Sequence, residues 1–537
     1  MNPHFLLTRT LTLTLPLTLT FTLTSLWLPG GARTAFAEKP TTATSPASAT
    51  ADASKVEGPL KALQALKIDS GKVVFLERIP ASPATPASIA TPAVGALPTR
   101  TVVKLVLNPA PGSNINVEAW LPDPEKWNGR FIGLGNGGSA GRINSLSLAG
   151  PAAEGYAVAT TDMGTAPNAN SGIGNKEVWK DFGFRATHLM TVTAKQLVQA
   201  YYGKAPQYSY FNGGSTGGQQ ALQEAQRYPE DYDGIVANVP AHCRTPLHAY
   251  FLWNDQILRQ CPFTEAQEEN IIAAGNEFMA SRELPQTAGK MVSDPRCTEA
   301  DIEAVITLAR KKDATLTDKH AEAMRKLFGG PKHAITGERI FCGIPLGSTF
   351  KAAHGHLYLF QWVFGAQKDL ATLDFGKDID TYTAELGPYL NAENADLSAF
   401  EKRGGKLILI SGSADSVVPY HATLDYYERV VEHFGSLEKA GSFCKFYLIP
   451  GMSHGPGPGI NGLPNMLKAV IEWREKQVAP GAIQGRRVVN GKTEIEIPLP
   501  PYPGKTVVDP AGGFKTVAGP RGGVERVAEK FRPAAKE

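Results

Sequence analysis

Residues 208–218 read Tyr-Ser-Tyr-Phe-Asn-Gly-Gly-Ser-Thr-Gly-Gly and form the strongest motif of the chain. Its aromatic first half favours a β-strand, and residues 219–227 behind it favour a helix. The turn between them carries the pattern Gly-x-Ser-x-Gly around Ser215, which on its own also fits an ordinary glycine-rich turn. A serine on a sharp strand-to-helix turn needs small neighbours, and here glycines surround it. The context therefore predicts a nucleophile elbow with Ser215 as the nucleophile.

A nucleophilic serine needs a base and an acid that orients the base, and two later loops provide candidates. The strand predicted at 406–411 leads into a loop with Asp415, and the strand predicted at 445–449 leads into Pro-Gly-Met-Ser-His, which ends at His454. Where such an elbow is used, the acid and then the histidine follow late strands. We therefore predict a triad of Ser215, Asp415 and His454, against the alternative that Asp415 is a turn residue. The other histidines considered are expected to be surface, core or packed helix residues: His188, His354, His356, His421 and His433.

Such a site also needs N–H groups that bind the oxyanion of the tetrahedral intermediate. The backbone amide of Thr216 is the first predicted donor. The second is expected from the glycine-rich segment 135–141, with the amide of Gly138 as the donor and Gly137 beside it. Glycines also serve dinucleotide sites, but no suitable helix and acidic residue follow this segment.

Around these motifs, short apolar runs alternate with helical stretches, which predicts a mostly parallel sheet covered on both faces. The alternation stops near residue 242, gives way to helices and loops, and then resumes with the strand at 406–411. Together with the elbow, this pattern predicts an α/β-hydrolase fold with a large inserted, mainly helical lid domain. The other predicted strands are 102–107, 131–134, 156–161, 208–211 and 235–237, and the clearest predicted helices are 178–202, 265–281, 318–328, 422–434 and 464–476.

The N-terminus has the layout of a secretory signal. Arg9 precedes an apolar, threonine-rich stretch at 11–28, and a small-residue triplet ends at Ala37. An uncleaved membrane anchor is the alternative, but that stretch is weakly apolar for a spanning helix. We expect cleavage near Ala37, a secreted or periplasmic protein and no stable membrane anchor. The predicted parts are a signal peptide (1–37), a flexible linker (38–56), the first part of the core (57–241), the lid (242–395), the second part of the core (396–480) and a Pro/Gly-rich C-terminal tail (481–537).

The composition excludes some classes of partner. Of 537 residues, 54 are Lys or Arg and 51 are Asp or Glu, so the net charge is only +3. The basic residues form no stripe, and no nucleic-acid partner is expected. The cysteines lack a Cys-x-x-Cys pair, which argues against a cysteine metal site, and the sequence leaves their disulfide connectivity open: Cys243, Cys261, Cys297, Cys342 and Cys444.

With these motifs in place, the chain resembles the tannase and feruloyl esterase family, which includes mono(2-hydroxyethyl) terephthalate hydrolase. The resemblance runs from about residue 57 to about residue 515, and its most specific stretches are Trp-Asn-Gly-Arg-Phe-Ile-Gly-Leu-Gly-Asn-Gly-Gly at 127–138, Asp-Phe-Gly-Phe-Arg-Ala at 181–186, residues 208–241 and residues 400–454. It implies an α/β-hydrolase core, a lid that builds an aromatic acyl pocket, and hydrolysis of aromatic esters.

The chain departs from the family pattern at two sites. Members usually carry cysteines directly before the nucleophile and directly after the histidine, joined in a disulfide, where this chain has Gly214 and Gly455. The family also has an aspartate-rich calcium loop before an Asp-Pro-x-x-Cys stretch. Here Asp294-Pro-Arg-Cys297 follows a segment at 277–292 without the spaced aspartates that calcium needs, so a family-type calcium site is predicted absent and no cofactor is expected.

Three functions are compatible with these observations. The first is a serine esterase that hydrolyses feruloyl, galloyl or related aromatic esters, with a small molecule or a plant polymer as substrate. The second is a broader carboxylesterase or depolymerase for aliphatic or synthetic, terephthalate-type esters. The third is a secreted binding protein without catalysis, which the complete triad argues against.

Overall fold

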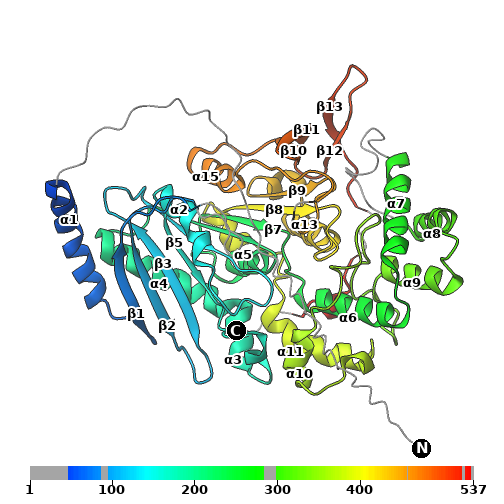
Figure 1. Ribbon diagram of the computed structural model, residues 1–537, viewed down its shortest axis with the longest axis horizontal. Helices are drawn as coiled ribbons and strands as arrows, with labels where there is room; N and C mark the ends of the chain where they lie inside the picture. The colour runs from blue at the N-terminus through cyan, green and yellow to red at the C-terminus, as the bar shows by residue number, and fades with distance from the viewer. Residues whose placement is uncertain (1–45, 86–94, 283–297, 456, 523–525, 534–537) are drawn as a thin grey trace, which may run out of the picture. The chain divides into compact units, whose positions relative to one another are not determined.

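The computed structural model describes residues 46–85, 95–282, 298–455, 457–522 and 526–533 (Figure 1). The predicted signal peptide (1–37) and its cleavage site at Ala37 lie outside the described residues, as do Cys297 and the Asp294 stretch. Residues Pro46–Glu537 form one compact unit. None of its described helices is long and apolar enough to cross a membrane.

A nine-stranded sheet forms the centre of the fold (Figure 1). Its order is β1-β2-β3-β5-β4-β6-β7-β8-β9, with all neighbours parallel from β5 to β9 and antiparallel from β1 to β5. The bounds are β1 Gly71–Ile79, β2 Arg100–Leu107, β3 Ile115–Pro122, β4 Arg130–Leu134, β5 Ala157–Thr161, β6 Tyr208–Gly214, β7 Gly234–Asn238, β8 Lys406–Gly412 and β9 Cys444–Ile449. The seven predicted strands correspond to β2 and to β4 through β9.

The antiparallel edge of the sheet was not predicted. A loop of seven residues joins β2 to β3, and so short a connection can join only antiparallel strands. The strands β1 and β3 went unrecognised, since residues such as Glu77 and Glu118 interrupt their apolar runs.

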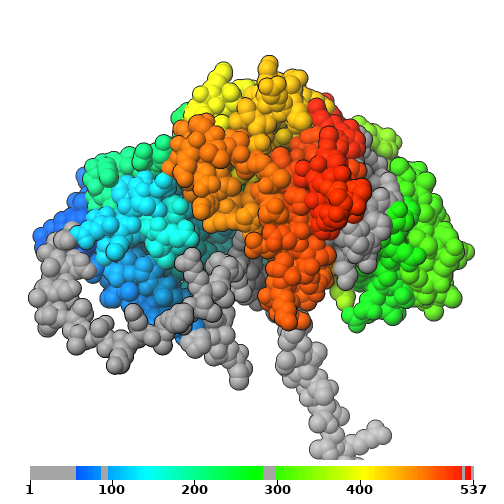
Figure 2. All heavy atoms as spheres, turned by 90° about the horizontal axis from the view of Figure 1, so that it is seen from above, coloured from blue at the N-terminus to red at the C-terminus, as the bar shows by residue number. Residues whose placement is uncertain are grey.

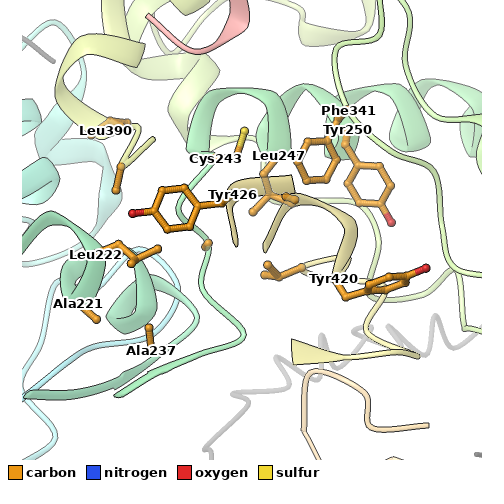
Figure 3. Close-up of a cluster of buried hydrophobic side chains, with 14 of the residues drawn as sticks. Ala221, Leu222, Ala237, Cys243, Leu247, Tyr250, Phe341, Leu390, Tyr420 and Tyr426 are labelled. Atoms are coloured by element: carbon orange, nitrogen blue, oxygen red, sulfur yellow. The ribbon is translucent and has the colours of Figure 1, made fainter. Parts of the chain in front are cut away.

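Helices cover both faces of the sheet, as predicted. Leu407 and Leu409 of β8 belong to one apolar layer, and Ile408 and Ile410 belong to the other, because successive residues of a strand point to opposite faces. The first layer includes α4 (Ala186–Tyr202), α5 (Thr216–Arg227) and α13 (His421–Phe434), and the second includes α2 (Ala149–Ala153) and α15 (Met466–Lys476). Figure 3 shows part of the first layer, where side chains of α5, β7, α6 (Arg244–Gln260) and α13 meet: Ala221, Leu222, Ala237, Leu247, Tyr250 and Tyr426.

The chain between β7 and β8 is helical. Within its described part, residues 242–282 and 298–395, it adds no strand to the sheet. The predicted helices at 265–281 and 318–328 are α7 and α9. After α6, the helices of this insertion are α7 Glu265–Arg282, α8 Glu299–Lys312, α9 Asp318–Gly329, α10 Tyr358–Phe364 and α11 Lys377–Leu390.

The predicted helix at 178–202 is divided into three pieces. It consists of α3 (Lys176–Lys180), a π-helical turn at Asp181–Arg185 and α4. The remaining short helices are α12 (Ser398–Lys402) and α14 (Leu437–Gly441).

The predicted linker (38–56) is wrong from Pro46 onward. A helix, α1, spans Pro46–Ala65, and its Val56 and Leu63 are buried. Proline suits the first position of a helix and alanine is the best helix former, so Pro46 and the alanines of this segment favour a helix. Pro59 inside the helix is unfavourable, and packing of the later turns on the core offsets it.

The predicted Pro/Gly-rich C-terminal tail (481–537) has regular secondary structure that the sequence analysis did not predict. It contains two hairpins, β10–β11 and β12–β13, which Figure 2 shows on the molecular surface in orange to red. Asn490 and Gly491 join the first pair with positive φ angles of 50° and 75°, as a tight hairpin turn requires. The bounds are β10 Ile483–Val489, β11 Lys492–Leu499, β12 Gly504–Val508 and β13 Phe514–Ala518.

Candidate active site

Ser215 occupies the turn between β6 and α5. Its φ of 60° and ψ of −118° lie in a strained region for a non-glycine residue. The backbone N–H of Ser215 donates to the carbonyl of Asn238 at 3.0 Å, which ties the turn to β7. A Cβ atom on Gly213 would lie 2.3 Å from the carbonyl oxygen of Gly217, so only glycine allows the two arms of the turn to approach this closely.

The structure brings together the three side chains predicted as a triad. The Nε2 atom of His454 lies 3.0 Å from Oγ of Ser215, and its Nδ1 atom lies 2.8 Å from Oδ2 of Asp415. Asp415 is fully buried, whereas the side chain of His454 is 21% exposed and can be reached from outside. The three residues thus form one continuous hydrogen-bonded chain from β6, β8 and β9.

The loop after β8 fixes the carboxylate of Asp415. Oδ1, the carboxylate oxygen that does not contact His454, accepts hydrogen bonds from the backbone N–H groups of Val417 and Val418 at 2.9 and 2.8 Å. The hydroxyl of Tyr250 in α6 donates to the carbonyl of Ser416 at 2.8 Å, so the insertion supports this loop. These bonds leave Oδ2 directed at the imidazole.

Hydrogen bonds also join the loop of Asp415 to the loop of His454. The N–H of Gly451 donates to Oγ of Ser413 at 2.7 Å, and the N–H of Ala414 donates to the carbonyl of Met452 at 3.0 Å. The acid and the base therefore sit on one connected substructure.

The environment of His454 favours a protonated imidazole. Burial lowers the pKa of this imidazole, but the charge of Asp415 and its hydrogen bond together outweigh burial, and the net pKa is raised above the ordinary value. A base with a raised pKa binds more firmly the proton that it takes from a serine hydroxyl.

The glycine-rich segment after β4 lies against the start of α5. The N–H of Gly217 donates to the carbonyl of Asn136 at 2.7 Å, and the N–H of Asn136 donates to Oε1 of Gln220 at 2.8 Å. Gly137 and Gly138 are exposed. Thr216 opens α5, where N–H groups have no partner within the helix. The predicted oxyanion donors thus lie at one place, beside the turn of Ser215.

Sequence reasoning missed a polar group behind these donors. Arg244 and Tyr358 meet Thr216 and the carbonyl of Gly138. Neither residue belongs to a recognisable motif. The structure also places His356, predicted as a surface or core residue, close enough to His454 for the charge of His454 to act on it. Desolvation, the charge of Arg244 and the proximity of His454 lower the pKa of His356 to about 4.

Among the described residues, one side-chain group has the composition of a metal site: His188, Glu224 and Asp231. Nδ1 of His188 lies 2.6 Å from Oδ2 of Asp231, and the ammonium of Lys195 donates to the carbonyl of Asp231. Burial and the charge of Asp231 raise the pKa of Glu224 well above its usual value, which favours its neutral form. These contacts make His188 and Asp231 part of a hydrogen-bond network that joins α4 to the loop after α5.

No disulfide joins two of the described cysteines. Cys243, Cys261 and Cys444 are buried and free. Burial raises the pKa of the thiols of Cys243 and Cys444, so both stay protonated.

The chain is similar to known proteins in sequence and in structure. A family model described as tannase and feruloyl esterase matches residues 101–366 and 365–519. A probable feruloyl esterase B-2 of Aspergillus flavus is 30% identical over 438 residues, which cover 74% of this chain and 82% of the relative. An uncharacterized esterase of Xanthomonas campestris is 30% identical over 455 residues, with 74% and 78% covered.

Solved structures agree on the fold. Feruloyl esterase B from Aspergillus oryzae superposes with a TM-score of 0.73 at 24% identity, covering 86% of this chain and all of the other. Tannin acyl hydrolase from Aspergillus niger superposes with a TM-score of 0.69 at 18% identity, covering 87% and 94%. The sheet, its helices and these likenesses establish an α/β-hydrolase fold.

Proposed function

The chain belongs to the tannase and feruloyl esterase family of carboxylic ester hydrolases, and on that premise we propose that it cleaves esters of aromatic acids through an acyl-enzyme on Ser215. The observation that carries the proposal is the unbroken chain from Asp415 through His454 to Ser215, with contacts of 2.8 and 3.0 Å. The aromatic acyl group is supported by the relatives, whose names refer to feruloyl and tannin substrates.

The proposed reaction has two halves. His454 takes the hydroxyl proton as Ser215 attacks the ester carbonyl, and it then gives that proton to the departing alcohol. Water attacks the acyl-enzyme in the second half, again with His454 as base, and releases the acid. Asp415 orients the imidazole and stabilises its charged form. The amides of Thr216 and Gly138 bind the oxyanion in both tetrahedral intermediates.

The insertion is proposed to act as a lid that forms the wall of the acyl pocket. Support comes from its position, because α6 and α10 contribute Tyr250, Arg244 and Tyr358, which contact the loops around the triad. Secretion after cleavage near Ala37 is proposed on the signal-like N-terminus. N-terminal sequencing of the exported protein tests the cleavage site, and retention of Met1 would contradict it.

Hydrolysis of four substrates tests the function: methyl ferulate, methyl gallate, mono(2-hydroxyethyl) terephthalate and a short aliphatic p-nitrophenyl ester. We expect cleavage of the aromatic acyl esters, loss of at least about 10³-fold in kcat for Ser215→Ala, and an acyl adduct on residue 215 by mass spectrometry. Cleavage of the aliphatic ester alone would favour a broader carboxylesterase. No turnover by the wild type would favour a binding protein.

A further inference from the structure

Arg244 lies behind the proposed oxyanion site. It is the first residue of α6, directly after the loop that follows β7, and it is only 3% exposed. One guanidinium nitrogen donates to Oγ1 of Thr216 at 3.0 Å. The other donates to the carbonyl of Gly138 at 3.3 Å and to the hydroxyl of Tyr358 in α10 at 2.5 Å. A single side chain therefore connects the elbow, the glycine-rich segment and the insertion.

Among the described residues, no carboxylate forms an ion pair with the positive charge of Arg244. Its Nε atom is buried without a hydrogen-bond partner. Its guanidinium instead packs over the ring of Phe182 at 5.2 Å. A buried cation without an anion is costly, and most buried charges are paired. Such a charge is well placed to interact with an anion that exists only during the reaction.

The contacts of Arg244 also restrain the glycine-rich segment. Gly138 has a φ of +58° and is exposed, so its two peptide planes would turn easily if they were free. Its carbonyl accepts both the hydroxyl of Thr216, at 2.6 Å, and the guanidinium. A carbonyl that turned toward the substrate would oppose the oxyanion with its negative end. The bonds from Thr216 and Arg244 hold that carbonyl on the far side.

We propose that Arg244 is a positioning residue that holds the Gly138 and Thr216 amides in oxyanion-binding geometry and adds a buried positive charge that favours the anionic tetrahedral intermediate. This inference rests on the proposed ester hydrolysis. Tyr358 supports the guanidinium from α10, so the insertion acts on the reaction itself in addition to forming a pocket wall. Desolvation and the charge of Arg244 lower the pKa of the nearby His356 to about 4, so its imidazole is neutral near pH 7 and does not compete for an anion.

The first test compares kcat and KM for Arg244→Met and Arg244→Lys. We expect Arg244→Met to lower kcat by about 10²-fold, the loss typical of a disrupted oxyanion hole, while KM changes little. Arg244→Lys keeps the positive charge but lacks the planar guanidinium with its several N–H donors. Its kcat should therefore lie between that of Arg244→Met and that of the wild type. Tyr358→Phe should have a smaller effect of the same kind. An unchanged kcat in Arg244→Met would overturn the proposal.

Arg227→Met is a matched control. Like Arg244, Arg227 packs its guanidinium on a phenylalanine ring, 4.2 Å from that of Phe184, and its Nε donates to Gln223, but it is only partly buried and lies at the far end of α5. We expect this variant to lower the melting temperature about as much as Arg244→Met and to retain kcat. An equal loss of kcat in both variants would reduce the role of Arg244 to general stability.

A second test measures binding rather than turnover. An arylboronic acid forms a negatively charged tetrahedral adduct with a serine, whereas the neutral amide analogue of methyl ferulate imitates the ground state. Arg244→Met should weaken boronate binding by about the factor by which it lowers kcat, and it should leave amide binding within about twofold of the wild type. Equal weakening of both ligands would overturn the proposal. If the wild type cleaves no ester, the proposed function fails, while the boronate comparison still decides the role of Arg244.

Discussion

The proposed base, His454, depends on one neighbour for its ionisation. Burial alone would lower the pKa of its imidazole, and only the charge and hydrogen bond of Asp415 reverse that effect. The same carboxylate sets which ring nitrogen carries the proton. The pH dependence of the reaction therefore reports on the contact between Nδ1 of His454 and Oδ2 of Asp415, which are 2.8 Å apart.

The pH profile of kcat/KM gives a prediction for this pair. His454 acts as base only when neutral, so activity should rise with pH through a pKa above the ordinary histidine value of about 6.5. Asp415→Asn removes the influence that raises this pKa and leaves burial, so the residual activity should show its acidic limb at lower pH. The rate itself should fall by about 10⁴-fold, because the wrong tautomer is favoured. An acidic limb that stays in place in Asp415→Asn would contradict this account.

Single residues were predictable where they follow a strand in a motif. Ser215, Asp415 and His454 were predicted from their positions after strands, and the structure brings them within hydrogen-bonding distance. Arg244 was not predictable, because its partners lie at positions 138, 216 and 358 and no local pattern connects them.

At the level of elements, the elbow and the glycine-rich segment are packed backbone against backbone. A Cβ atom on Gly135 would lie 2.5 Å from Cα of Gly217. Gly135→Ala should therefore push the segment away from α5 and lower kcat by about 10²-fold, as loss of an oxyanion donor does. Gly441→Ala in α14 serves as the control, since nothing lies within 4 Å of its added Cβ. Kinetics and melting curves of both variants check the prediction, and normal kcat in Gly135→Ala would contradict it.

An engineered disulfide between the turn of Ser215 and the loop of His454 should stabilise the protein. The family resemblance implies a bridge at the positions of Gly214 and Gly455. A Cβ on Gly455 would meet nothing within 4 Å, and one on Gly214 would meet only Asn238, at 3.7 Å or more. The double variant Gly214→Cys/Gly455→Cys should form the bridge and stabilise the fold by about 2–4 kcal/mol.

Melting curves with and without reductant measure that gain, and each single cysteine variant is the matched control. A double variant with two free thiols, or one that melts no higher than its reduced form, would show that the two loops lie in a different geometry from that of the family.

Elements were predictable where apolar periodicity was strong. The parallel strands β4 to β9 and the helices α7, α9, α13 and α15 agree with the predicted segments within a few residues. The strands β1 and β3 and the C-terminal hairpins were missed. Exposed polar residues, Pro and Gly obscure their alternation, and pairing with neighbours distant in sequence decides their structure.

For the molecule as a whole, the segment 526–533 contributes to the core. Val527 and Phe531 are 4% and 1% exposed. The N–H of Ala528 donates to the carbonyl of Arg339 at 3.2 Å, and Nδ2 of Asn391 donates to the carbonyl of Phe531 at 3.3 Å, so the segment binds the insertion at two places. Composition alone could not reveal this burial, because the segment has few apolar residues and the residues that cover them lie far away in the sequence.

Deletion of residues 523–537 tests the importance of this segment. Each buried apolar side chain of this size contributes about 1.5–3 kcal/mol, so the deletion should destabilise the protein by several kcal/mol. Denaturant unfolding of the truncated and complete proteins measures the loss. Phe531→Ala should reproduce much of it, and Lys530→Ala at the partly exposed neighbouring position should not. Equal stability of the truncated and complete proteins would contradict the prediction.

The buried position of Phe531 has a consequence for biosynthesis. A growing polypeptide can complete this part of its core only after Phe531 has emerged from the ribosome, because that side chain is 1% exposed in the folded protein. Until then the helices between β7 and β8 lack one of their neighbours, and the nascent protein exposes apolar surface to chaperones and proteases.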